Sequence, residues 1–125
     1  MTPKFVGLKE AVERWLGNLF TFDGRATRSE YWWVVLVISI AASVISVILN
    51  AVGLNEKVVS TILGIAEEVL IIGLSVRRLH DVGKGWGWIF IEIVPIIGWI
   101  WYFVLMVTAS VGDNQYGPMA TVENK

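Results

Sequence analysis

The sequence predicts an all-α membrane protein in which an amphipathic interfacial helix precedes three transmembrane helices. The first observation is composition: the 125-residue chain is 55% hydrophobic and only 17% charged, whereas a soluble domain carries about 25% charged residues. The second is that the apolar residues gather in three stretches, each about as long as the ~20 residues that cross a bilayer. This composition excludes a disordered chain and disfavours a globular enzyme with a polar surface.

The first element is expected over residues 1–22. Apolar side chains recur there at intervals of three and four, the period of an amphipathic helix: Phe5, Leu8, Val12, Trp15, Leu16, Leu19 and Phe20. Two arrangements fit this stripe equally well. It lies in the membrane interface with its aromatic side down, or it packs on the ends of the helix bundle.

The first transmembrane helix is expected over residues 27–52. Thr27 and Glu30 have the spacing of a capping box, in which the Thr27 side chain accepts the Glu30 N–H and Glu30 reaches back to Thr27. Tyr31, Trp32 and Trp33 follow at once. Aromatic residues are enriched at the level of the lipid headgroups, so the helix is predicted to enter the membrane here.

Two further transmembrane helices are expected over residues 58–76 and 86–111, followed by a tail over residues 112–125. With three spans, the tail emerges on the side opposite the amino terminus. Pro95 and Gly98 interrupt the third stretch, and a break there has the alternative outcome of a re-entrant helix pair that brings the tail back.

The basic residues predict the orientation. If the amino-terminal segment and the loop between the second and third spans share a side, that side holds eight of the ten basic residues: Lys4, Lys9, Arg14, Arg25, Arg28, Arg77, Arg78 and Lys84. Cytoplasmic loops carry the excess of Lys and Arg. We therefore expect a multi-pass membrane protein with a cytoplasmic amino terminus.

Three glutamates fall at bilayer depth, namely Glu67, Glu68 and Glu92. An intramembrane charge costs about 2.5 to 3.5 kcal/mol on insertion scales, and such residues usually face the bundle interior or a water path. We expect these carboxyls to be protonated. They predict either a proton- or cation-responsive site or, as the favoured interpretation, hydrogen bonds between helices or between copies of the chain.

A second group of charged residues borders the membrane on the predicted cytoplasmic side: Arg25, Arg28, Arg77, Arg78, His80, Asp81 and Lys84. Basic side chains at this level contact lipid phosphates. His80 is the single histidine and Cys is absent, which argues against a metal site. Pairing of His80 with Asp81 or Glu30 as an acid–base group is less favoured than a role in organising the loop. No catalytic residue, metal, cofactor or nucleic-acid partner is expected.

Three separated motifs, at residues 22–33, 77–84 and 112–118, carry a resemblance to a known family. In this order they are similar to the YhaH-type bacterial inner-membrane family, catalogued as domain of unknown function 805. Residues 84–88 depart mildly from the family's loop pattern. The resemblance implies a location in the bacterial inner (plasma) membrane and a multi-pass topology, but no activity. The excess of Lys and Arg on the cytoplasmic side puts the first two motifs on one membrane face. There Glu30 or Asp81 is predicted to pair with the arginines and lock the first transmembrane helix to the end of the second.

Two classes of function fit these features. The favoured one is a non-enzymatic structural or interaction protein of the inner membrane that contacts anionic lipid headgroups or a partner. The alternative is an oligomeric proton- or cation-coupled transport component that uses the intramembrane glutamates. A homo-oligomer is compatible with both classes.

Overall fold

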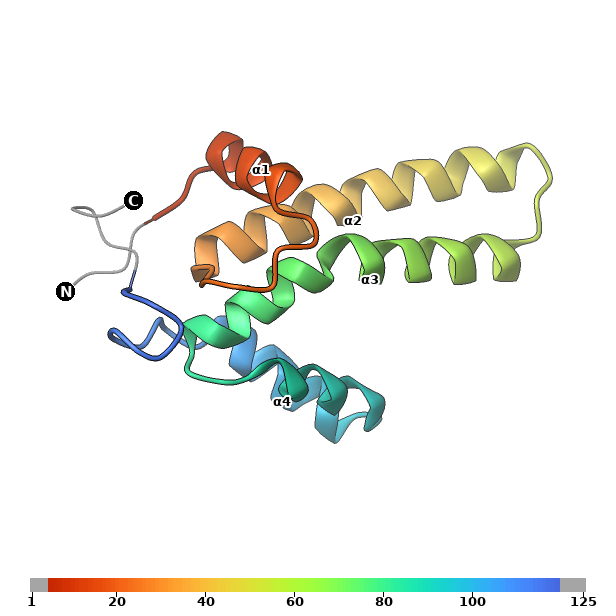
Figure 1. The fold of residues 1–125 in the computed structure, drawn as a ribbon. Helices are drawn as coiled ribbons and strands as arrows, with labels where there is room; N and C mark the ends of the chain where they lie inside the picture. Colours follow the sequence, from red (N-terminus) through yellow and green to blue (C-terminus); the bar gives the residue numbers. More distant parts are fainter. Residues whose placement is uncertain (1–4, 120–125) are drawn as a thin grey trace.

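A computed structural model describes residues 5–119 of the chain. Its elements are the helices α1 (Leu8–Gly17), α2 (Arg28–Ala51), α3 (Glu56–Asp81) and α4 (Ile97–Val107), with a 3-10 helix η1 (Trp86–Ile93) between the last two. Figure 1 shows α2 and α3 as a long antiparallel pair, with α1 lying across the first half of α2. Helices η1 and α4 pack against each other and against α3. The fold is all-helical, as the sequence predicts.

Helix α2 begins where the sequence predicts it. The Thr27 Oγ1 accepts the Glu30 N–H at 3.4 Å, which is the first half of the expected capping box. The second half is wrong: the Glu30 carboxylate forms ion pairs with Arg14 and Arg77 instead of returning to Thr27. A local partner has been exchanged for two charged partners from other helices.

Within residues 5–119, α2 and α3 are the two helices long and apolar enough to cross a membrane, judged by length and composition. A short turn joins them. In this turn the side chain of Asn55 caps α3 by accepting the N–H groups of Lys57 and Val58. At its other end α3 stops before Gly83, whose φ of 81° is a conformation that favours glycine.

The expected third transmembrane helix over residues 86–111 is wrong. This stretch folds into η1 and the 11-residue α4, joined by a turn at Pro95 and Ile96. Proline cannot continue a helix from the residues before it. Gly98 then lets the two pieces approach so closely that a Cβ atom at this position would lie 1.9 Å from the Ile91 carbonyl oxygen. The segment is therefore a helical hairpin, the alternative that Pro95 and Gly98 indicated.

Because the hairpin reverses the chain, the segment after α4 returns to the end of the molecule where α2 begins and α3 ends. We call this the arginine end. The Val111 N–H donates to the Asp81 carbonyl at 3.0 Å, and Arg25 donates to the Gly112 carbonyl. The expectation that the tail emerges on the opposite side is thus wrong for the described residues; residues 120–125 lie outside them.

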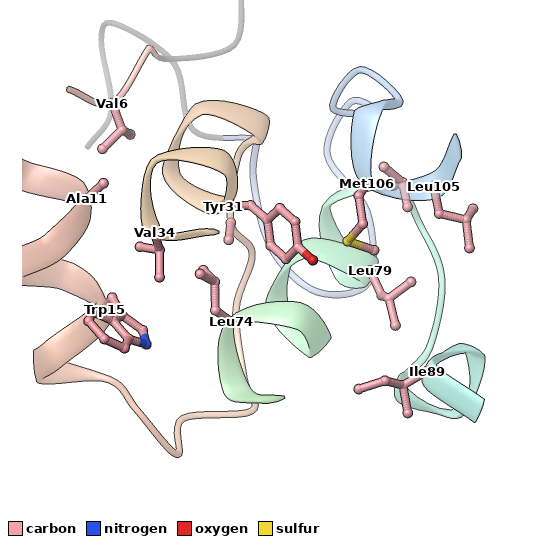
Figure 2. Packing of buried hydrophobic residues seen from close by; sticks show 12 residues of the cluster. Val6, Ala11, Trp15, Tyr31, Val34, Leu74, Leu79, Ile89, Leu105 and Met106 are labelled. Atoms are coloured by element: carbon pink, nitrogen blue, oxygen red, sulfur yellow. The ribbon is translucent and has the colours of Figure 1, made fainter. Parts of the chain in front are cut away.

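The core lies at the arginine end. Figure 2 shows side chains from every helix meeting there, including Trp15, Val34, Leu74, Ile89 and Met106. In contrast, α2 has no buried residue after Val34, so its distal half presents Val, Ile and Leu side chains outward. Such a surface is typical of contact with lipid acyl chains.

Helix α1 packs on the helix bundle, the second of the two arrangements that its stripe allowed. Ala11 and Trp15 are buried against the bundle, and the Trp15 indole N–H donates to the Leu70 carbonyl on α3 at 2.8 Å. Leu8 and Leu16 remain exposed. The expected helix over residues 1–22 is thus shorter, and its first four residues lie outside the described part of the chain.

Candidate functional site

Asp81, the last residue of α3, stands at the centre of a buried group of charges. Its Oδ1 accepts a hydrogen bond from Arg25 Nε at 3.0 Å, and its Oδ2 accepts one from Arg78 Nη1 at 2.8 Å. The Ser110 hydroxyl also donates to Oδ2. The side chains of Asp81 and Arg78 are fully buried and that of Arg25 is 4% exposed, so these charges depend on one another for compensation.

Arg25 fastens the carboxyl-terminal segment to this group. Besides the Asp81 carboxylate, its guanidinium donates to the backbone carbonyls of Asp81 at 3.1 Å, Val111 at 2.5 Å, Gly112 at 2.9 Å and Gly117 at 3.0 Å. All five donors of a guanidinium are therefore used. The returning segment lies where it does because this arginine binds its backbone.

A second carboxylate, Glu30, forms the other half of the group. Its Oε2 accepts from Arg77 Nη1 at 3.2 Å, and its Oε1 lies 3.2 Å from Arg14 Nε in an ion pair that lacks hydrogen-bond geometry. Arg77 also donates to the carbonyls of Thr21 at 3.2 Å and Asn18 at 3.3 Å. The two ion pairs of Glu30 thus connect α1, α2 and α3. We call the whole group the arginine network; it consists of Arg14, Arg25, Glu30, Arg77, Arg78 and Asp81.

The network holds four guanidinium groups and two carboxylates, and backbone carbonyls supply the remaining acceptors. Many of them belong to helix ends. Asn18 follows the end of α1, Asp81 ends α3, and Met106 and Thr108, which accept from Arg78, lie at the end of α4. The carboxyl-terminal end of a helix carries partial negative charge. Three such ends therefore converge on the arginines and help to offset their excess positive charge.

The ion pairs predicted between Glu30 or Asp81 and the arginines are present, and they change the interpretation of the basic cluster. Arg25, Arg77 and Arg78 are at most 6% exposed in their side chains, so their guanidinium groups are not free to contact lipid phosphates. Arg28 is exposed and makes a peripheral bond to the Val107 carbonyl at 3.3 Å. Lys84 places its ammonium 5.0 Å from the centre of the Trp88 ring.

His80 is adjacent to the network but is not part of it. Its Nδ1 lies 2.9 Å from the Gly24 carbonyl oxygen, so this nitrogen carries the proton. Its ring stacks on Tyr116 at a centroid distance of 3.8 Å, and its backbone carbonyl accepts from Asn114. The expected alternative pairing with Asp81 or Glu30 is wrong, because the arginines occupy both carboxylates.

A cavity of about 780 Å³ opens beside His80. We call it the interfacial cavity. Residues from all three sequence motifs line it, among them Asp23, His80 and Tyr116, together with Trp86 and Ile89 of η1. The arginine network holds these motifs in place, since Arg25 binds the segment that carries Tyr116.

A second hollow of about 500 Å³ adjoins this cavity, because Ile72, Ile89 and Phe90 line both. Glu68 and Glu92 line the second hollow and lie close enough for their carboxyl groups to interact. We call it the glutamate hollow. Glu68 is exposed and Glu92 is half-buried, so these two residues border a surface groove between α3 and η1. Glu67 is half-buried and lines neither hollow.

Sequence reasoning missed three contributors to this region. The sequence indicates Arg14 only as one of the basic residues that predict the orientation, although it forms an ion pair with Glu30. Asp23 and Tyr116 were noted only as parts of motifs. Asp23 and Tyr116 lie in the first and third motifs, and this was the signal that could have brought them together; Arg14 lies outside the motifs and carried no such signal.

Comparison with known proteins supplies the context for this site. The sequence profile described as "Protein of unknown function (DUF805)" matches residues 19–118. The inner membrane protein YhaI of Escherichia coli K12 is 36% identical over 103 residues, which cover 82% of this chain and 87% of the relative. The inner membrane protein YhaH of the same strain is 33% identical over 113 residues, covering 86% and 93%. No solved structure matches the chain.

Proposed function

The chain belongs to the DUF805 family of proteins of unknown function, and from that premise we propose that it is a two-pass, non-enzymatic protein of the bacterial inner membrane that contacts anionic lipid headgroups at its arginine end. Two helices of membrane-spanning length and relatives that are inner membrane proteins support the location. The arginine network serves as the scaffold of this end and not as its binding surface.

The orientation follows from charge. Among residues 5–119, the opposite end holds Lys57, in the first turn of α3. The arginine end holds seven basic residues: Lys9, Arg14, Arg25, Arg28, Arg77, Arg78 and Lys84. Positive charge is retained on the cytoplasmic side. We therefore place the amino terminus and the segment after α4 in the cytoplasm.

The observation that carries the proposal is the separation of the arginine-end cations into two sets. Arg25, Arg77 and Arg78, which the sequence predicts to contact lipid, are buried in the network. Lys9, Arg28 and Lys84 are left at the same end. The Lys84 ammonium lies on Trp88, a residue type enriched at headgroup level. Of these three, Arg28 and Lys84 belong to the motifs that the network holds in place. Two cations held on a rigid scaffold favour a phosphate at moderate affinity, since each basic residue near the surface contributes about 1 kcal/mol.

The test is the thermal stability of the purified chain in detergent micelles with added phosphatidylglycerol or phosphatidylcholine. Phosphatidylglycerol is expected to raise Tm more than phosphatidylcholine does, and the Arg28→Gln/Lys84→Gln double variant is expected to lose this difference. Lys57→Gln, which removes a cation from the opposite end, is the matched control and should retain it. Equal stabilisation of wild type by both lipids would contradict the proposal.

One observation favours a second candidate, an oligomeric proton- or cation-coupled transport component. Glu68 and Glu92 come from different helices and meet in one hollow, although neither has a basic neighbour along its helix. Proton or cation flux into liposomes containing the chain tests it. Glu68→Gln should abolish the flux, and Glu67→Gln, outside the hollow, should preserve it. Absence of flux in wild type rejects this candidate.

A further inference from the structure

The interfacial cavity and the glutamate hollow together have the dimensions and position of a ligand site. The cavity's volume of about 780 Å³ lies within the 300 to 1,000 Å³ typical of small-molecule sites. His80 and Glu68 are twelve residues apart on α3, so the two hollows extend roughly 18 Å along this helix. A ligand entering this groove leaves the headgroup level and contacts apolar side chains.

The groove is acidic although the end of the molecule that holds it is rich in arginine. Asp23 lines the interfacial cavity, and Glu68 and Glu92 line the glutamate hollow. Among residues 5–119, no lysine or arginine lines either hollow. The neighbouring arginines are turned into the network, where carboxylates and carbonyls compensate them. Asp23 is the carboxylate that lines the interfacial cavity itself, so charge complementarity at this cavity selects a cation and disfavours an anion.

The walls of the interfacial cavity add a second feature that attracts cations. Four aromatic side chains line it: Phe22, Trp86, Phe90 and Tyr116. The faces of aromatic rings attract cations, and ammonium groups are recognised in cages of such rings. Ile72, Val76 and Ile89 complete the walls with aliphatic surface, which suits the apolar substituents of a ligand.

We propose that the interfacial cavity binds a compact lipophilic organic cation, a quaternary ammonium or phosphonium ion with aromatic or alkyl substituents. Asp23 and the aromatic rings receive the charge, and the apolar substituents lie against Ile72 and Ile89. The inference goes beyond both functions above, because it requires neither selectivity for anionic lipids nor movement of an ion across the membrane.

Equilibrium dialysis of the purified full chain in non-ionic detergent tests the site, with protein-free micelles as the background. The probes are tetraphenylphosphonium and tetraphenylborate, which have nearly the same shape and opposite charge. Saturable binding of tetraphenylphosphonium, at least about tenfold tighter than that of tetraphenylborate, is expected, since a difference of 1.4 kcal/mol is a factor of ten. Equal binding of the two ions, or no saturable binding of the cation, overturns the proposal.

Variants then locate the bound charge. Asp23→Asn keeps the shape of the side chain and is expected to weaken tetraphenylphosphonium binding about tenfold, and Trp86→Leu about fivefold. Glu13→Gln removes an exposed carboxylate of α1, outside the groove, and should change binding less than twofold. Equal Tm values for the variants and wild type show that the fold is kept. Unchanged affinity in Asp23→Asn overturns the assignment whatever the other variants do.

Discussion

Nε of Arg25 donates to Oδ1 of Asp81 at 3.0 Å, although the two residues are 56 positions apart. This bond joins the loop before α2 to the end of α3. Because the same guanidinium also binds the backbone of residues 111–117, the pair fixes three segments that come from the three sequence motifs. The motifs are therefore held together by one buried charge pair and its neighbours.

Removal of the Asp81 carboxylate tests this role. Asp81→Ala leaves Arg25 and Arg78 buried without their shared counter-charge, and loss of one partner of a buried pair costs about 3 to 5 kcal/mol. We expect the free energy of unfolding in detergent to fall by about this amount, measured by denaturant titration of tryptophan fluorescence. Arg78→Ala should have a comparable effect, because it leaves the Asp81 carboxylate less compensated. If both variants unfold like wild type, the network does not hold the fold together.

A surface substitution is the control for these variants. Glu13→Gln changes an exposed carboxylate, and surface substitutions usually stay within about 0.5 kcal/mol. A loss of stability in the network variants but not in Glu13→Gln shows that the effect comes from the buried network. A general effect of charge on the protein–detergent complex would lower the stability of all of them.

The sequence predicts the parts of the fold that depend on local pattern. Thr27 marks the start of α2 because capping needs only a hydroxyl and an N–H three residues later. The length of the uncharged stretch after Glu30 predicts a helix that can span the bilayer. Glu30 itself shows the limit of local pattern: the capping box predicts that its carboxylate returns to Thr27, whereas Arg14 and Arg77 bind it from other helices. Pairing with an arginine was predictable only from the separated motifs, and Arg14 lies in none of them.

The carboxyl-terminal third could not be predicted from hydropathy alone. A spanning helix and a helical hairpin at membrane depth are both apolar throughout, so composition does not separate them. Pro95 and Gly98 carried the information, through a missing N–H and a missing Cβ. The acidic groove was hidden for a related reason, since Asp23, Glu68 and Glu92 are distant in sequence and line adjoining hollows only because the hairpin packs on α3.

Cysteine labelling tests the topology that follows from the hairpin. The chain has no native Cys, so Gln115→Cys and Leu54→Cys, both at exposed positions, give single reporters at opposite ends. In intact cells, a membrane-impermeant maleimide should label position 54 and not position 115. Position 115 should react only after permeabilisation. Labelling of position 115 from outside would contradict the hairpin and show that the chain crosses the membrane a third time.

The close approach at Gly98 predicts a large effect from one methyl group. In Gly98→Ala the new Cβ would lie 1.9 Å from the Ile91 carbonyl oxygen, which is backbone and cannot rotate away. The hairpin must open, and overpacking of this kind costs about 1 to 3 kcal/mol or more. Thermal unfolding in detergent should show a clear loss of Tm. Gly64→Ala on α3 is the matched control, because a Cβ there meets nothing within 4 Å and alanine favours the helix.

The turn before α4 predicts a substitution that stabilises the chain. Ile96 has φ 66° and ψ −71°, a conformation that is strained for a β-branched residue and costs on the order of 1 to 3 kcal/mol. Glycine adopts it without that cost, so Ile96→Gly is expected to stabilise the chain by about 1 kcal/mol after the entropy lost by a glycine on folding. The same change at Ile100, inside α4, should destabilise it by about 1 kcal/mol. Denaturant titration of the two variants side by side measures both effects, and a loss of stability in Ile96→Gly would show that the turn is not strained.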